Sequence, residues 1–133
     1  MAYGIFINDD GPVMFTKEII KLRKPIETRS RNVFKQLIGK EVYLISTSKK
    51  RSPHVVGWCK IAKVEFKTAA WLNDHRDLTK IPVGTAYDVS DGGKFCYYLE
   101  NVESFGAYAL PADAIRHGRS WCEFNEKEVF CGY

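Results

Sequence analysis

Short runs of apolar residues, interrupted by Gly, Pro and polar turn residues, are the feature that most constrains how this chain folds. Within most runs, β-branched and aromatic side chains alternate with polar ones, which is the pattern of a half-buried β-strand. The runs are residues 2–7, 26–29, 41–47, 55–66, 94–102 and 120–124. Helical spacing of apolar residues occurs only in short segments, at 14–22, 33–37 and 68–75. Closely spaced strands with two or three short helices predict an α+β domain built on a small barrel or a strongly bent sheet.

Individual residues predict how some of these elements begin or bend. Thr16 and Thr68 are candidate N-caps of the first and last helical segments. Gly57 interrupts a long strand and predicts a bulge or a close backbone approach. Residues 77–90 are expected to be irregular, and 129–133 to add a short edge strand.

The composition fits one domain, spanning residues 1–133, with one core. The chain has 133 residues, of which 45% are hydrophobic and 14% aromatic, enough to bury a sizeable core. Apolar runs all fall short of the ~18–20 residues of a membrane span. The first ten residues lack the charged and apolar regions of a signal peptide. We therefore expect a cytoplasmic protein without a membrane partner.

The four cysteines do not follow a metal-binding or redox pattern. Cys59, Cys96, Cys122 and Cys131 form no C-x-x-C pair, and no Cys/His spacing matches a zinc site. We expect reduced thiols, and neither a metal nor another cofactor.

The positive charge is concentrated in one part of the sequence. The chain carries a net charge of +4, but residues 17–51 hold eleven Lys/Arg against three Asp/Glu, a net of +8. A basic face on a nearly neutral protein favours an anionic partner, with nucleic acid first. The alternative is an ordinary solvated surface.

Three charged residues stand close together inside this basic region, at Lys24, Glu27 and Arg29. Side chains alternate along a strand, so Glu27 and Arg29 should project from the same face, with Cα atoms about 6–7 Å apart. Lys24 precedes this strand and follows the first helical segment. Such a cluster can be an ion pair that holds the fold, or it can present donors and an acceptor to a polar ligand.

The residues around this cluster resemble a known family. Leu22-Arg23-Lys24-Pro25-Ile26-Glu27-Thr28-Arg29 is similar to the G-x-K-x-x-E-x-R signature of ASCH domains, members of the PUA-like superfamily. Weaker similarities follow in the family's order, at Gly39-Lys40, Val42-Tyr43-Leu44-Ile45, Val55-Val56-Gly57-Trp58, Tyr97-Tyr98-Leu99-Glu100-Asn101-Val102, Pro111 and Gly118-Arg119-Ser120-Trp121. The resemblance spans nearly the whole chain. It implies a PUA-like small β-barrel whose ligand cleft is lined by Lys24, Glu27 and Arg29.

Leu22 departs from the family pattern, which has Gly at this position. That Gly ends the first helix and often adopts a left-handed backbone. The substitution predicts a different helix exit here, with Lys24 displaced relative to the family.

The resemblance implies RNA or nucleotide binding, with two alternatives kept open. Some relatives are N4-acetylcytidine amidohydrolases and others have been described as ribonucleases, in which case Lys24 would be the catalytic base with Glu27 beside it. The amidohydrolases carry Thr where this chain has Glu27, which argues against that activity. The other alternative is a protein-interaction adaptor that uses residues 68–90; the sequence names no partner for it.

Further residues complete the predicted binding surface. Thr47 follows a strand and could line the cleft mouth with its hydroxyl, although polar residues are ordinary in loops. Tyr98 shares a strand face with Glu100 and is the best candidate to stack on an unpaired base, although most aromatic residues of this chain should be core. Contacts to the phosphate backbone are predicted for Arg31, Lys49, Lys50 and Arg51.

Overall fold

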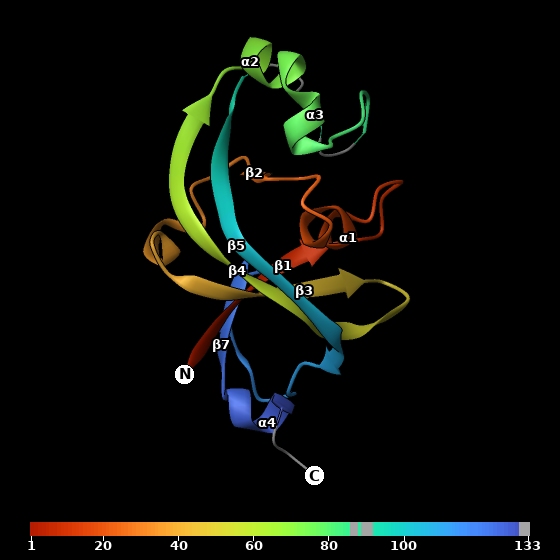
Figure 1. Ribbon diagram of the computed structural model, residues 1–133, viewed down its shortest axis with the longest axis vertical. Coiled ribbons are helices and arrows are strands. Elements are labelled where there is room, and N and C mark those ends of the chain that lie inside the picture. The colour runs from red at the N-terminus through yellow and green to blue at the C-terminus, as the bar shows by residue number, and fades with distance from the viewer. Residues whose placement is uncertain (86–87, 89–91, 131–133) are drawn as a thin grey trace.

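A computed structural model describes residues 1–85, 88 and 92–130 of the chain (Figure 1). The elements are, in order, β1 (Ala2–Asn8), α1 (Phe15–Ile20), β2 (Ile26–Arg29), the 3₁₀ helix η1 (Lys35–Leu37), β3 (Glu41–Ser48), β4 (Arg51–Lys67), α2 (Ala69–Asp74), α3 (Arg76–Thr79), β5 (Lys94–Ala109), β6 (Ile115–His117), β7 (Trp121–Phe124) and α4 (Glu126–Phe130).

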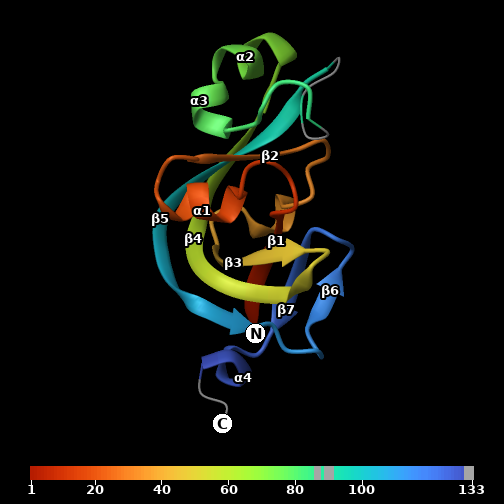
Figure 2. The same cartoon turned by 90° about the vertical axis from the view of Figure 1, so that its right-hand side faces the viewer.

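The seven strands form one mixed sheet in the order β2-β5-β4-β3-β1-β7-β6. Only β1 and β3 pair in parallel among the pairs that the structure describes. The long strands β4 and β5 bend the sheet into a half-barrel, with α2 and α3 at one end and α4 at the other (Figure 2). This is an α+β fold with a strongly bent sheet and short helices, as predicted from the sequence.

Bulges produce the bend of β4 and β5. Their register shifts three times, between Val55 and Gly57, between Trp58 and Lys60, and between Ile61 and Lys63. Bulges increase the local twist and bend of a strand. A Cβ on Gly57 would lie 2.6 Å from the carbonyl oxygen of Glu103, so the predicted close approach at Gly57 is confirmed.

The core follows the strand alternation. One large cluster fills the half-barrel and includes Ile5, Phe34, Leu44, Ile61 and Tyr97, all with 0% exposure. The hydroxyl of Tyr97 donates a hydrogen bond to Asn32 Oδ1 at 2.8 Å. The three described cysteines are also buried, whereas Cys131 lies outside the described residues.

Strands and helices both differ in part from the sequence prediction, since β5 continues to Ala109 beyond the expected 94–102 and β6 was not predicted. The helix expected at 14–22 spans only Phe15–Ile20 and begins after Met14, because Thr16 lies within the helix and donates its hydroxyl to Asp9 instead. The segment 33–37 forms only a 3₁₀ turn. Thr68 caps α2 as predicted, with its side chain accepting from the backbone N–H of Trp71.

Two segments that were assigned no helix contain one. Residues 77–79, expected to be irregular, belong to α3 (Arg76–Thr79), whose left-handed C-cap is Lys80. Val129 and Phe130, expected in an edge strand, end α4 and pack beside Phe105 and Phe124, since the acidic turn at Glu126 starts a helix there. Residues 131–133 of that expected strand lie outside the described residues.

Candidate functional site

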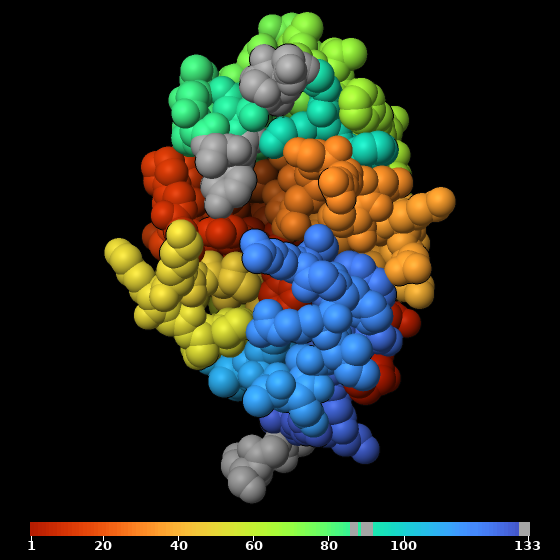
Figure 3. Space-filling model, turned by 180° about the vertical axis from the view of Figure 1, so that it is seen from behind, coloured from red at the N-terminus to blue at the C-terminus, as the bar shows by residue number. Residues whose placement is uncertain are grey.

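The structure contains a cavity of about 420 Å³. Its wall includes residues of both edge strands of the sheet, β2 and β6. Three residues come from the β2 strand, Glu27, Thr28 and Arg29, and one, Arg116, from β6. In the space-filling view, the blue β6–β7 segment faces the orange segment around β2 and the yellow β3–β4 hairpin (Figure 3). The open side of the half-barrel is therefore the place where a ligand can enter.

The backbone after α1 positions Lys24. The N–H of Leu22 donates to the carbonyl of Ile19 at 3.0 Å, and the N–H of Arg23 donates to the carbonyl of Glu18 at 2.9 Å. These two bonds form a Schellman motif around Leu22, whose φ is 60°. Leu22 thus adopts the left-handed backbone that a glycine would supply. The predicted change in the helix exit is wrong, because the leucine tolerates that conformation at an exposed position.

Lys24 is buried at the cavity wall, with 1% of its side chain exposed. Its Nζ donates to the carbonyl oxygen of Thr79 at the end of α3 and lies 3.4 Å from Glu27 Oε1. The ammonium also sits 4.8 Å from the centre of the Phe15 ring. Burial lowers the pKa of Lys24, and the nearby carboxylate of Glu27 only partly opposes this.

Glu27 lies between two cations. Its Oε2 is 3.1 Å from Arg29 NH2, and its Oε1 accepts from the backbone N–H of Thr28 at 3.2 Å. Burial raises the pKa of Glu27, but the charges of Lys24 and Arg29 outweigh it, so the pKa lies below its usual value. Glu27 is therefore ionised and neutralised from both sides.

Arg29 joins the β2 edge to β1. Its NH2 donates to the carbonyl oxygen of Phe6 at 2.5 Å, and its guanidinium lies 4.8 Å from the Phe34 ring centre. The side chain of Arg29 is 23% exposed, against 8% for Glu27 and 1% for Lys24. The three residues form one chain of ion pairs, and the same residues line a wall of the cavity.

Of the other predicted contact residues, Thr47 belongs to the cavity lining, whereas Arg31, Lys49 and Lys50 do not. Thr47 lines the cavity and donates its hydroxyl to the carbonyl of Ile7 at 3.2 Å. Lys49 and Lys50 are exposed on the turn between β3 and β4, and Arg31 is exposed after β2.

Tyr98 is not among the residues that line the cavity. It pairs with Ile26 across β2 and β5 and belongs to a separate apolar cluster with Leu72. The Nζ of Lys63 covers its ring at 4.6 Å. Strand alternation places Tyr98 on the opposite face from Tyr97, which lies in the main core.

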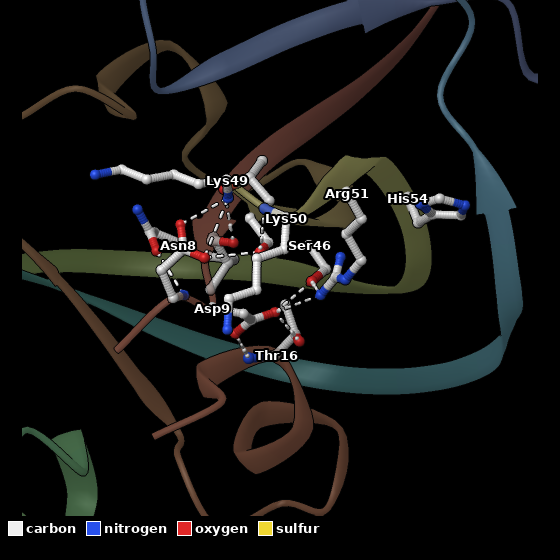
Figure 4. Close-up of polar contacts among 12 residues, drawn as sticks. Asn8, Asp9, Thr16, Ser46, Lys49, Lys50, Arg51 and His54 are labelled. Atoms are coloured by element: carbon white, nitrogen blue, oxygen red, sulfur yellow. Dashed lines mark hydrogen bonds and ion pairs between the residues drawn. The ribbon is translucent and has the colours of Figure 1, made fainter. Parts of the chain in front are cut away.

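The sequence analysis missed a buried carboxylate beside the cavity, Asp9 (Figure 4). Its Oδ1 accepts from the backbone N–H of Thr16 at 3.1 Å, and its Oδ2 accepts from the hydroxyls of Thr16 and Ser46. Arg51 donates to Ser46 Oγ at 2.7 Å and lies 4.0 Å from Asp9 Oδ2. Arg51 is therefore engaged with this network. Asp9 links β1, α1 and β3 next to the cavity residues Asn8 and Thr47.

Four further cavity residues with a cationic or amide side chain were also missed, namely Asn8, Lys94, Arg116 and Arg119. Arg119 lies within the Gly118-Arg119-Ser120-Trp121 segment that resembles the ASCH family, and this was the one sequence signal for it. The others had none, because each reaches the site through the pairing of distant strands.

The structure provides no cluster of three or more His, Cys, Asp or Glu side chains for a metal within the described residues. None of the helices it describes is long and apolar enough to cross a membrane.

Comparison with known proteins finds the fold but no close relative. No protein-family model and no curated protein matches the chain. A solved structure does match, that of a point mutant of ZmASCH from Zymomonas mobilis, with a TM-score of 0.63 and 12% sequence identity over 94% of this chain and 90% of that chain. The chain therefore has the fold of an ASCH domain protein, as its motifs predicted.

Proposed function

We propose that this protein is an RNA- or nucleotide-binding module that takes a nucleotide into the cavity between β2 and β6. The observation that carries the proposal is the charge of the cavity wall. One carboxylate, Glu27, is present among the described residues that line it, against five cationic side chains, Lys24, Arg29, Lys94, Arg116 and Arg119.

The size and chemistry of the cavity support a nucleotide. Its volume of about 420 Å³ lies within the range of small-molecule sites. Phe6 and Phe15 supply apolar surface, and Asn8, Ser30 and Thr47 supply polar groups that can contact a base or a sugar. Because Glu27 is neutralised by Lys24 and Arg29, the exposed guanidinium groups of Arg116 and Arg119 give the wall a positive field.

A surface beside the cavity can hold the backbone of a longer RNA. Lys49 and Lys50 project from the hairpin that carries Thr47, and Arg31 follows the strand that carries Arg29. Phosphate contacts give affinity and position, whereas contacts within the cavity give selection.

A fluorescence anisotropy titration with a labelled single-stranded RNA tests the proposal. We expect binding that is much weaker at 200 mM than at 50 mM salt. Ser30→Tyr, which fills the cavity with a ring, should abolish competition by mononucleotides without lowering the melting temperature. Ser104→Tyr, at an exposed position of β5 outside the cavity, is the matched control. Absence of salt-sensitive binding by the wild type would rule out the proposal.

The burial of Lys24 favours one second candidate, an enzyme that acts on RNA or on acetylated cytidine. A lysine whose pKa is lowered can act as a general base. Chromatography of N4-acetylcytidine and of RNA after incubation with the protein should then show product, and Lys24→Gln should abolish it. If the wild type releases no product, this candidate fails and the binding module stands.

A further inference from the structure

We propose that Arg116 and Arg119 form a phosphate-binding subsite, so that the cavity takes a phosphate ester of a nucleoside in preference to the nucleoside itself. This inference rests on the proposed function, because it assumes that a nucleotide occupies the cavity.

The two arginines reach the cavity from one short segment. Arg116 is the middle residue of β6, and Arg119 lies in the turn to β7, directly after Gly118, whose φ of 63° shapes that turn. The guanidinium of Arg116 lies 4.9 Å from the centre of the Phe6 ring, itself part of the cavity wall. Stacking on this ring holds the cation at the wall while both arginines stay exposed to an entering ligand.

The charges of these arginines are unbalanced within the protein. Arg23, Arg29 and Arg76 each have a carboxylate within 3.1 Å. In the part of the chain that the structure describes, neither Arg116 nor Arg119 forms an ion pair. Two guanidinium groups on one wall repel each other, and a phosphate between them would relieve that repulsion.

Glu123, the acidic residue on the neighbouring strand β7, pairs with His117 and not with Arg116. Glu123 of β7 accepts from His117 Nε2 at 2.8 Å, and the His117 ring stacks on Trp121 at 3.9 Å. Arg116 pairs with Cys122, whereas His117 pairs with Trp121, so strand alternation puts Arg116 on the opposite face from the His117–Glu123 pair. The cavity face of β6 therefore keeps its positive charge.

The phosphate group of a nucleotide fits this pair of arginines. A planar guanidinium donates two parallel hydrogen bonds to phosphate oxygens, and two such groups satisfy most of its acceptors. The polar residues Asn8 and Thr47 also line the cavity, where they can contact the nucleoside part.

Isothermal titration calorimetry with four nucleosides and their 5′-monophosphates tests the subsite. We expect the wild type to bind a monophosphate at least about tenfold more tightly than the matched nucleoside. The double variant Arg116→Gln/Arg119→Gln should lose this preference, so that it binds a nucleoside and its monophosphate with equal affinity. The control is Arg23→Gln/Lys127→Gln, which removes the same charge outside the cavity and should keep the preference.

The arms of this experiment separate the outcomes. A single-stranded RNA without terminal phosphates serves as a competitor. If it competes for the wild type but not for the Arg116/Arg119 variant, the subsite binds a phosphodiester of an RNA chain and not a free nucleotide. Equal affinity for nucleosides and monophosphates in the wild type would overturn the subsite and leave the proposed function intact. Absence of binding by any nucleoside, nucleotide or RNA would overturn both.

Discussion

Leu22 has a strained backbone and lies two residues before Lys24, which lines the cavity. Its φ of 60° is unfavourable for a residue with a Cβ, by about 1–2 kcal/mol. Its side chain is 72% exposed, so removing it sacrifices little packing. We predict that Leu22→Gly raises the free energy of unfolding by about 1 kcal/mol, measured by chemical denaturation.

The neighbouring position supplies the control for this prediction. Lys21 has a φ of −81°, which any residue adopts without strain. Lys21→Gly should therefore lower stability by about 0.5–1 kcal/mol, because glycine loses more backbone entropy on folding. A destabilising Leu22→Gly would show that leucine contributes contacts that offset its strained backbone.

Glu27 should make stability depend on acid pH. Its pKa in the folded protein lies below the usual value of 4.5, since Lys24 and Arg29 favour the ionised form. A carboxyl group with a depressed pKa binds fewer protons in the folded state than in the unfolded one. The stability it contributes is therefore complete well above pH 4.5 and is lost as the pH falls through the lower folded pKa.

Glu27→Gln removes this contribution and leaves Lys24 buried without its anion. We predict a loss of about 3–5 kcal/mol at pH 7, typical of a broken buried pair. The difference from the wild type should shrink as the pH falls below about 4.5. Glu100→Gln, at a surface pair 3.7 Å from Lys60, should cost under about 1 kcal/mol. A difference that is constant from pH 7 to 3 would contradict an ionised Glu27.

Strands were predictable because their signal is local. Residues 26–29 form β2 with the predicted bounds, and Tyr97 lies in the core, as expected of most aromatic residues of this chain. Helix starts were harder, since a capping side chain can find a better partner elsewhere. Thr16 illustrates this: its hydroxyl bonds Asp9, seven residues earlier, instead of capping α1.

Asp9 directly follows β1 and connects it by hydrogen bonds to α1 and β3. Its carboxylate side chain is fully buried and accepts hydrogen bonds from β3 and α1. Asp9→Asn replaces one accepting oxygen by an NH₂ group that faces two hydroxyl donors. We predict a loss of about 1–3 kcal/mol in the free energy of unfolding, measured by urea denaturation.

The adjacent Asp10 is the matched control for Asp9. Its carboxylate bonds Ser48 and Lys49 at an exposed position, and these bonds lower its pKa. Asp10→Asn should therefore be much less destabilising. Equal losses for the two variants would show that the position in the loop matters and the buried network does not.

The cavity is a property of the whole molecule. The curled sheet brings β2 and β6 to the same opening although they are its two opposite edges. Sequence reasoning identified the β2 wall because Lys24, Glu27 and Arg29 form a compact motif. It missed the β6 wall because three residues of β6 carry no pattern that shows which way Arg116 faces, and only the closure of the sheet decides that.

The local concentration of cations on the surface, and not the net charge of the molecule, should determine how RNA binding depends on salt. A net charge of +4 is too small to bind RNA without a local concentration of cations. If Lys49 and Lys50 each neutralise one phosphate, the slope of log K against log salt should fall by about 1.4 in Lys49→Ala/Lys50→Ala, at roughly 0.7 per contact for a single strand. Lys60→Ala/Lys127→Ala removes the same charge elsewhere and should leave the slope unchanged. Anisotropy titrations at four salt concentrations measure it, and equal slopes for both variants would mean that RNA responds to net charge and not to the hairpin.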